Sequence, residues 1–306
     1  MGIGWHEAKA LVGLYKTNGP FGRAATLGRQ CLYFSLPRLK RMFKEAEATP
    51  RGSLDEFLTS SRVFADDFFK LLGADEVVSF DYSDFEGATV CHDMNLPIPE
   101  VYQNAFDVVF DGGTLEHIFN FPQAIKNCML MLRESGLFIA ATPANNFMGH
   151  GFYQFSPELF FRLFSMANGF RVERMMVFDW PEGGSWYEVG DPERLGKRVE
   201  LWGTGQRITL WVVARRIKVT NACLASLPQQ SDYSKAWTTP RVASATSSRP
   251  EVTSAALRSS ATSFLEQVSP RGMDSIRRLR AHRRFKREIS QRDLRFNNEA
   301  FKKVKS

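Results

Sequence analysis

The sequence predicts an α/β fold, with a doubly wound, mostly parallel, Rossmann-like sheet of seven strands and helices on both faces. Strand and helix patterns alternate along the first 220 residues, which is the order that such a sheet requires. Residues 136–141 are continuously apolar, as is typical of a strand buried on both faces of a parallel sheet. The composition, 43% hydrophobic and 24% charged over 306 residues, is that of a globular protein with a sizeable core.

Each element is predicted from its spacing of apolar residues and from the residues that bound it. Helical spacing predicts helices at residues 5–16, 36–48, 61–72, 122–133 and 156–168. Short apolar runs predict strands at residues 24–27, 76–80, 88–91, 106–110, 136–141, 172–178 and 208–217. Gly73 is placed to end the third helix, Pro122 lies in the first turn of the fourth, and Ser156 caps the fifth.

A change in composition divides the chain into three parts. We predict an α/β domain at residues 1–220, a flexible linker rich in Ser, Thr and Pro at 221–270, and a basic amphipathic helical tail at 271–306. Residues 231–306 hold 17 Lys and Arg against 7 Asp and Glu, so they account for the net charge of +7. We therefore expect no nucleic-acid binding by the folded domain. The tail contacts an anionic surface, docks on the domain or a partner protein, or remains a solvated helix.

Several classes of protein are excluded by motifs that the sequence lacks. It contains no run of about 18 uncharged apolar residues, and its first residues do not form a basic and then apolar leader, so we expect a cytoplasmic protein. Its four cysteines lie far apart, which favours reduced thiols. No phosphate-binding loop, nucleophile elbow, dinucleotide-binding glycine motif or H-E-x-x-H pair occurs. We expect neither the matching enzyme classes nor a metal site.

Acidic residues and glycines follow three successive predicted strands. Asp81, Asp93 and the run Asp111-Gly112-Gly113 each stand where a strand ends. In an open parallel sheet, ligands bind beyond the carboxyl ends of the strands. A carboxylate at Asp81 suits the two hydroxyls of a ribose, and two glycines let a ligand approach the backbone. Each Asp alone also fits a solvated strand end, but their common position favours a ligand cleft.

The segment 106–118, FDVVFDGGTLEHI, resembles the fourth-strand motif of class I S-adenosylmethionine-dependent methyltransferases, in which F-D-x-V precedes a short loop and L-E-H. The resemblance covers about residues 20–215. It implies the Rossmann-like fold and S-adenosylmethionine as cofactor. The residues to which it assigns cofactor contacts are Asp81 at the ribose, Asp93 and Met94 at the adenine, and Gly28, Arg29, Asp111, Gly112, Gly113 and His117 along the remainder.

The family's first motif is reduced in this sequence. An acidic residue and a glycine-rich loop after the first strand are replaced by the single Gly28, followed by Arg29 and Gln30. One glycine still supplies a tight turn. Arg29 either adds bulk where the methionine part of the cofactor passes or pairs with its carboxylate.

The loop at residues 143–155 carries amides, an imidazole and aromatic rings where the family shapes its acceptor site. The expected substrate contacts are Asn145, Asn146 and Tyr153. His150 is the expected general base, because imidazole titrates near neutral pH. The same loop also fits a rigid segment whose side chains satisfy its own backbone. His117 fits either the cofactor cleft or a structural role, and Glu116 is expected to cap the following helix.

Two functions follow from these patterns. The first is S-adenosylmethionine-dependent methyl transfer to a small polar acceptor, with O-methylation of a sugar-like or secondary-metabolite hydroxyl favoured. The alternative is a non-catalytic protein of the same fold, whose basic tail recruits a partner or an anionic surface. The reduced first motif is the feature that supports the alternative.

Overall fold

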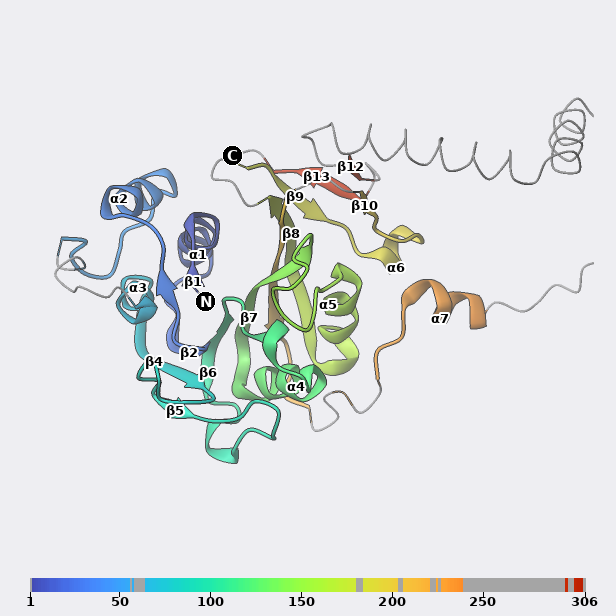
Figure 1. Ribbon diagram of the computed structural model, residues 1–306, viewed down its shortest axis with the longest axis horizontal. Helices are drawn as coiled ribbons and strands as arrows, with labels where there is room; N and C mark the ends of the chain where they lie inside the picture. The colour runs from blue at the N-terminus through green and yellow to red at the C-terminus, as the bar shows by residue number, and fades with distance from the viewer. Residues whose placement is uncertain are drawn as a thin grey trace, which may run out of the picture.

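The protein is described by a computed structural model, in which one large sheet forms the centre of the molecule (Figure 1). The residues described are 2–55, 57, 64–179, 184–202, 206–220, 224, 227–238, 295–296 and 300–304. The strands of the central sheet are β2 (Gly22–Leu27), β4 (Ala74–Asp81), β5 (Val90–Cys91), β6 (Phe106–Asp111), β7 (Leu132–Asn145), β8 (Phe170–Asp179), β9 (Trp186–Val189), β11 (Ile208–Arg216) and β13 (Phe301–Lys303).

The order of strands across the sheet is β13-β9-β8-β11-β7-β6-β2-β4-β5. β2 pairs in parallel with β4 and β6, β4 with β5, and β6 with β7. In contrast, β11 is antiparallel to both β7 and β8. The chain therefore starts in the middle with β2, moves to one edge with β4 and β5, and returns to the other side with β6. This is the doubly wound arrangement, and its switch point lies between β2 and β6.

The predicted α/β sheet is confirmed, but the expected count of seven strands differs from the nine strands that the central sheet contains among the described residues. All seven predicted strands are present. The two additional strands, β9 and β13, pair antiparallel at the β8 edge. β13 comes from the far end of the chain, and such long-range pairing leaves no local pattern in the sequence.

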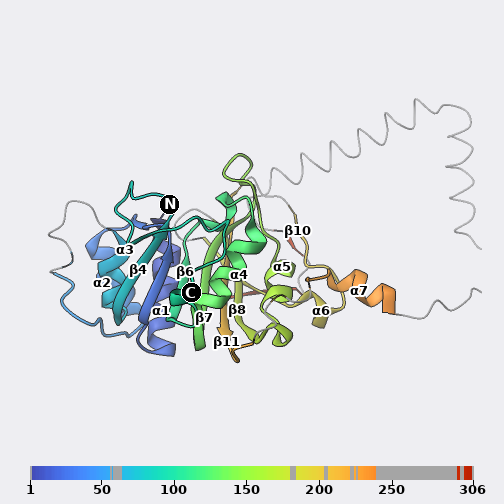
Figure 2. The ribbon, with the colours of Figure 1, turned by 90° about the horizontal axis from the view of Figure 1, so that it is seen from below.

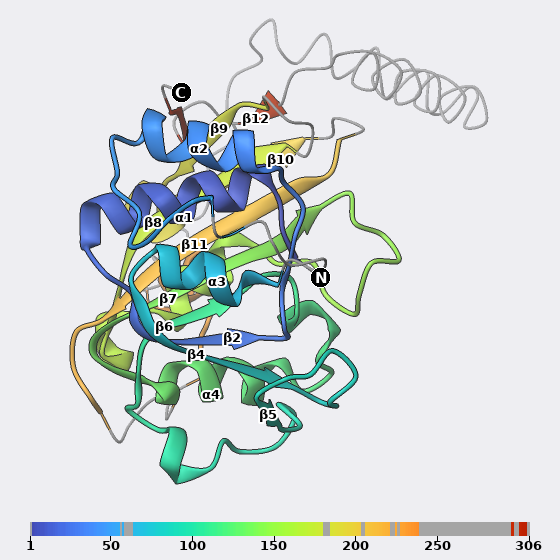
Figure 3. The same cartoon turned by 90° about the vertical axis from the view of Figure 1, so that its left-hand side faces the viewer.

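Helices cover both faces of the sheet, as the alternation of strands and helices predicts. The helices are α1 (Trp5–Asn18), α2 (Leu36–Glu45), α3 (Ala65–Leu71), α4 (Phe121–Met131), α5 (Pro157–Leu163), α6 (Pro192–Leu195) and α7 (Ser231–Thr238), with 3₁₀ turns η2 (Glu100–Tyr102), η3 (Leu115–His117) and η4 (Met166–Asn168). Viewed from one side, α1, α2 and α3 lie in front of the strands (Figure 3). None of the helices that the structure describes is long and apolar enough to cross a bilayer.

Two hydrophobic cores lie on the two faces. Along β11, Trp211 and Val213 pack with α1, α2 and α3, while Leu210 and Val212 pack with α4 and α5. This alternation follows from the two-residue period of a strand, and both sets are apolar because both faces are covered. The expected cap of α5 is also observed, since Ser156 Oγ accepts a hydrogen bond from the Glu158 amide at 3.3 Å.

The expected linker and tail are described only in part. Within the expected linker, residues 231–238 form α7, which lies next to α6 (Figure 2) and is joined to the domain by an ion pair between Arg198 and Asp232 at 2.7 Å. The amphipathic helix expected in the tail lies outside the described residues. Near the end of the tail, Ala300 and Phe301 are buried against the domain, so this part belongs to the folded body.

A short parallel pairing brings the N-terminus to the carboxyl edge of the central sheet. β1 (Gly2–Ile3) pairs with β3 (Cys31–Leu32), which follows β2 directly. β10 (Leu201–Trp202) and β12 (Arg295–Phe296) form a separate antiparallel pair. Because β1 leads straight into α1, the first residues of the chain cover the edge at which ligands bind in such folds.

Candidate functional site

A cavity of about 590 Å³ lies at the carboxyl edge of the sheet. Its walls come from the N-terminal segment, the residue after β3, the loops after β6 and β7, the end of β8 and the start of β11. Because β11 runs antiparallel to its neighbours, its first residues reach this edge. The lining residues are Gly2, Gly4, Trp5, His6, Glu7, Tyr33, Gly112, Gly113, Glu116, His117, Ala141, Pro143, Phe147, His150, Phe178, Arg207 and Thr209.

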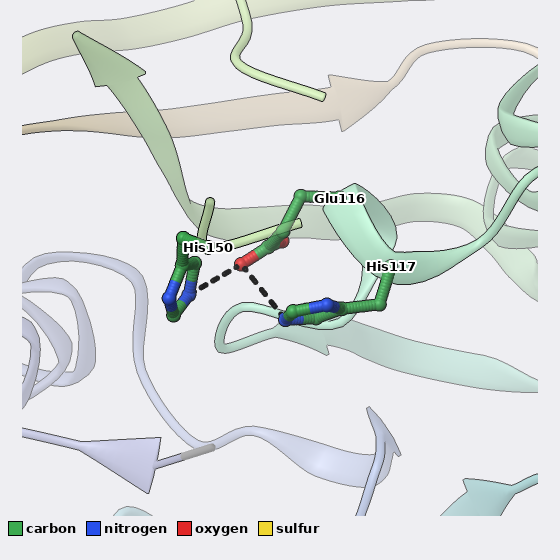
Figure 4. A group of neighbouring side chains, drawn as sticks. All are labelled: Glu116, His117 and His150. Atoms are coloured by element: carbon green, nitrogen blue, oxygen red, sulfur yellow. Dashed lines mark ion pairs between the residues drawn. The ribbon is translucent and has the colours of Figure 1, made fainter. Parts of the chain in front are cut away.

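Three titratable side chains converge on one side of this cavity (Figure 4). Glu116 and His117 belong to η3, and His150 belongs to the loop after β7. Glu116 Oε1 lies 3.4 Å from His150 Nε2 and 3.8 Å from His117 Nε2. The Glu116 side chain is 1% exposed, and neither of its oxygens has a hydrogen-bond partner among the described residues, whereas the two imidazoles are 40–45% exposed. A buried carboxylate thus faces two accessible imidazoles.

The backbone of Glu116 holds the His150 loop in place. Its carbonyl oxygen accepts hydrogen bonds from the amides of Phe152 at 2.8 Å and Tyr153 at 3.2 Å. Gly151 lies so close to Glu116 that a Cβ there would come within 2.8 Å of the same oxygen. The loop and η3 are therefore docked through the backbone, which fixes His150 beside Glu116.

Burial governs the ionisation of this group. Burial raises the pKa of Glu116 well above its ordinary value, and the neighbouring charge of Asp111 raises it further. Burial likewise raises the pKa of Asp111, although its Oδ1 accepts hydrogen bonds from the amides of Thr114 and Leu115. Partial burial and the proximity of His150 lower the pKa of His117. The site therefore favours neutral side chains or a bound cation that balances a carboxylate.

The switch point of the sheet is occupied by a side chain of the reduced first motif. Gln30 is buried, and its Nε2 donates to the carbonyl of Leu27 at 2.5 Å, while Thr114 Oγ1 donates to the same oxygen at 2.8 Å. Gln30 Oε1 lies directly against Gly112. Gly28 has a positive φ of 68°, as expected for the single glycine that makes the tight turn after β2.

Arg29 faces away from the cavity. Its Nη1 donates to the carbonyls of Glu86 and Gly87, each at 3.0 Å, and its guanidinium lies over the Phe64 ring at 4.1 Å from the ring centre. Its Nε also contacts Asp66 at 3.4 Å. These contacts hold the loop after β4, and they satisfy the arginine without a ligand.

The expected ribose and adenine contacts lie at the same edge but outside the cavity lining. Asp81 ends β4, is half-buried, and accepts a hydrogen bond from the Tyr82 amide at 2.7 Å. Asp93 Oδ1 accepts two hydrogen bonds from Asn95, which lower the pKa of Asp93. The Met94 side chain is 5% exposed and packs in the hydrophobic core, so its apolar character serves folding.

The three expected substrate contacts do not line the cavity. Asn145 Oδ1 accepts a hydrogen bond from the Asn146 amide at 3.0 Å. Asn146 Nδ2 donates to the carbonyl of Gln206 at 2.6 Å. The Tyr153 hydroxyl donates to the carbonyl of Phe119 at 2.7 Å. Asn145 thus bonds within its own loop, whereas Asn146 and Tyr153 bond to backbone carbonyls of the neighbouring segments before β11 and after η3. Such contacts are of the kind that the rigid-loop interpretation expects, and a role of these residues in an acceptor site stays a prediction.

Of the residues expected to form the site, Gly112, Gly113, His117 and His150 meet at the cavity. Glu116 was not predicted as a site residue, because a carboxylate at the start of a helix is typical of a cap. The contribution of residues 2–7 was not predicted either, since it follows the long-range pairing of β1 with β3. The available signal for Glu116 was a charged residue next to His117 and between the apolar residues Leu115 and Ile118.

No protein-family model matches the sequence, and no curated protein matches it. Similar solved structures include a putative methyltransferase from Bacillus halodurans (10% identity, 70% of this chain and 100% of that chain, TM-score 0.39). A putative S-adenosylmethionine-dependent methyltransferase from Listeria monocytogenes has 14% identity, covers 70% and 98%, and has a TM-score of 0.36. The N-methyltransferase NodS from Bradyrhizobium japonicum, in complex with S-adenosylhomocysteine, has 10% identity, covers 70% and 87%, and has a TM-score of 0.38.

The names of these three structures describe methyltransferases, and similarity at this level assigns no activity or ligand to the present chain. The strand order itself defines a doubly wound, Rossmann-like α/β fold, with a glycine-containing loop after β6.

Proposed function

We propose that the chain is an S-adenosylmethionine-dependent methyltransferase whose small polar acceptor binds in the cavity at the carboxyl ends of β6 and β7. The observation that carries this proposal is the cavity itself, because it joins Gly112 and Gly113 of the strand-end motif to Glu116 and His150. Its volume of about 590 Å³ is in the range of small-molecule sites.

The described residues fit the cofactor at two points and need one rearrangement at a third. Asp81 offers a half-buried carboxylate for the ribose hydroxyls, and Gly113, with a φ of 98°, leaves backbone open beside the cavity. Beside Gly28, the cofactor needs the Gln30 side chain to turn away from Gly112. When bound, S-adenosylmethionine supplies an electrophilic methyl group.

The residues of the chain itself orient the acceptor and take up its proton. Aromatic rings of Trp5, Tyr33, Phe147 and Phe178 line the cavity, which suits the apolar face of a hydroxylated or sugar-like acceptor. His150 is the candidate base for the acceptor hydroxyl, since its imidazole lies in the cavity and is partly exposed. Most of the rate enhancement comes from alignment, because methyl transfer requires an in-line approach of the acceptor.

A second candidate, a non-catalytic binding protein, is favoured by the loop after β2. Gln30 and Thr114 both hydrogen-bond to the Leu27 carbonyl, and Arg29 is satisfied by the loop after β4. In this alternative the switch point is permanently filled, and the cavity or the basic tail binds a partner. The domain boundary near residue 220, a cytoplasmic location and the tail's partner stay predictions.

Calorimetric titration with S-adenosylhomocysteine of the wild type and of Gln30→Ala separates the two candidates. If the cofactor must displace Gln30, removal of this side chain removes the cost of an unfavourable rearrangement, so the variant binds several-fold more tightly. Gln103→Ala, which lies outside the cavity and the switch point, is the control. No binding by either the wild type or Gln30→Ala contradicts the methyltransferase proposal.

A further inference from the structure

We infer that Glu116, His117 and His150 form a binding site for one divalent transition-metal ion at the wall of the cavity. Two imidazoles and one carboxylate are the ligand set of many catalytic zinc and non-haem iron sites, which keep further coordination positions open. The three side chains each offer one ligand atom, and these atoms all lie within 4.8 Å of one another.

The spacing of the ligand atoms suits a single ion. Two atoms that are each about 2.1 Å from a tetrahedral ion lie about 3.4 Å apart. Glu116 Oε1 is 3.4 Å from His150 Nε2 and 3.8 Å from His117 Nε2. All three ligand atoms lie within 4.8 Å of one another, and the imidazoles are 40–45% exposed, so they have room to rotate toward a shared ion.

The state of Glu116 provides an independent observation. Its side chain is 1% exposed, and one carboxylate oxygen points at the two imidazoles (Figure 4). Within the part of the chain that the structure describes, both oxygens are buried without a hydrogen-bond partner. An unpartnered buried carboxyl group destabilises a fold, and a bound cation removes this penalty. The backbone contacts between Glu116 and residues 152–153 hold His150 in place before an ion binds.

Because the site lies in the cavity wall, the open coordination positions face the space in which a small molecule binds. A hydroxyl or water that coordinates a divalent ion loses its proton more readily. With an ion bound, His150 would serve as a ligand rather than as the base. The ion would polarise a coordinated acceptor hydroxyl, whose proton would pass to water in the cavity. Metal binding itself does not depend on methyl transfer.

The test is calorimetric titration of the full-length protein with zinc chloride, after removal of metals with a chelator and without any cofactor. We expect one equivalent to bind in the micromolar range or more tightly. The variants Glu116→Gln, His117→Ala and His150→Ala each weaken binding by at least about tenfold. His92→Ala is the matched control, because His92 is half-buried outside the cluster, and this variant keeps the wild-type affinity. Magnesium does not compete, because it prefers oxygen ligands.

Circular dichroism of the metal-free variants verifies that each is folded, and visible absorption of the cobalt-loaded wild type gives a second readout. A strong d–d band that is lost in His150→Ala supports coordination by this imidazole. The inference is overturned if zinc does not bind in one equivalent, if the three variants retain the affinity, or if His92→Ala loses as much. Failure of S-adenosylhomocysteine to bind leaves the metal result unaffected.

Discussion

Gln30 Oε1 packs directly against Gly112, across the switch point between β2 and β6. A Cβ at position 112 would lie 2.5 Å from this oxygen and 2.9 Å from Phe110 Cε1. This contact joins the loop after β2, which holds the reduced first motif, to the loop after β6, which holds the Asp111-Gly112-Gly113 motif. Two motifs that lie far apart in the sequence are therefore in direct contact. In the proposed function, a cofactor beside Gly28 displaces the Gln30 side chain.

Gly112→Ala is expected to lower the free energy of unfolding by roughly 1–3 kcal/mol, because the new methyl group overlaps a well-packed neighbour. The double variant Gly112→Ala, Gln30→Ala should be less destabilised than the sum of the two single variants, since the closest overlap is removed. Urea denaturation of the four proteins in the cycle measures the coupling. Additive effects would show that Gln30 does not restrict position 112.

Gly13→Ala is the matched control for this cycle. Gly13 lies within α1, and a Cβ there meets no atom within 4 Å. Alanine in a helix interior is more favourable than glycine by roughly 0.5–1 kcal/mol. The same denaturation experiment should therefore show stabilisation at position 13 and destabilisation at position 112.

Arg216, the last residue of β11, is buried beside the end of α4 and donates hydrogen bonds to acceptors there. Its guanidinium donates to the carbonyl of Leu132 and, at 2.7 Å, to Asn104 Oδ1. Arg216→Met keeps most of the volume but leaves these acceptors unsatisfied, so we expect a loss of roughly 1–3 kcal/mol in unfolding free energy. Arg171→Met, at an exposed pair with Glu173, should change stability by less than about 0.5 kcal/mol. An equal loss of unfolding free energy in both variants would contradict a stabilising role for the buried hydrogen bonds of Arg216.

Glu7, a carboxyl group in the cavity wall, predicts a pH dependence of stability. Burial raises its pKa from 4.5 to about 6, although its carboxylate accepts a hydrogen bond from the Gly4 amide. The folded state therefore prefers the protonated form, and this contribution is complete below about pH 4.5 and lost as the pH rises through about 6.

Glu7→Gln keeps the hydrogen bond to Gly4 and removes the charge. Above about pH 6 it should be more stable than the wild type by at most about 2 kcal/mol, and the difference should vanish below about pH 4.5. Denaturation curves across this range provide the measurement, with the exposed Glu134→Gln as control. A difference that does not vary with pH would contradict burial as its cause.

The sequence predicted those features that depend on local pattern. Asp81 and Asp111 end β4 and β6 as expected, because an apolar run followed by a polar residue marks a strand exit. The meeting of His117 with His150 was not predictable, since it depends on hydrogen bonds from residues 152–153 to the Glu116 carbonyl. Likewise, Met94 has the spacing of a cofactor contact but the burial of a core residue. The local sequence pattern does not predict contacts between loops that lie far apart in the sequence.

The most direct test of the proposed function is calorimetric titration of S-adenosylhomocysteine into the wild type, Asp81→Ala and Asp84→Ala. Asp84 lies in the loop after β4 and is exposed, so it matches Asp81 in charge and location. We expect micromolar binding by the wild type and Asp84→Ala, and a loss of at least about 1–2 kcal/mol in Asp81→Ala, because charge-assisted hydrogen bonds to the ribose are removed. No binding by the wild type at millimolar ligand, or equal binding by all three proteins, would contradict a cofactor site at the end of β4.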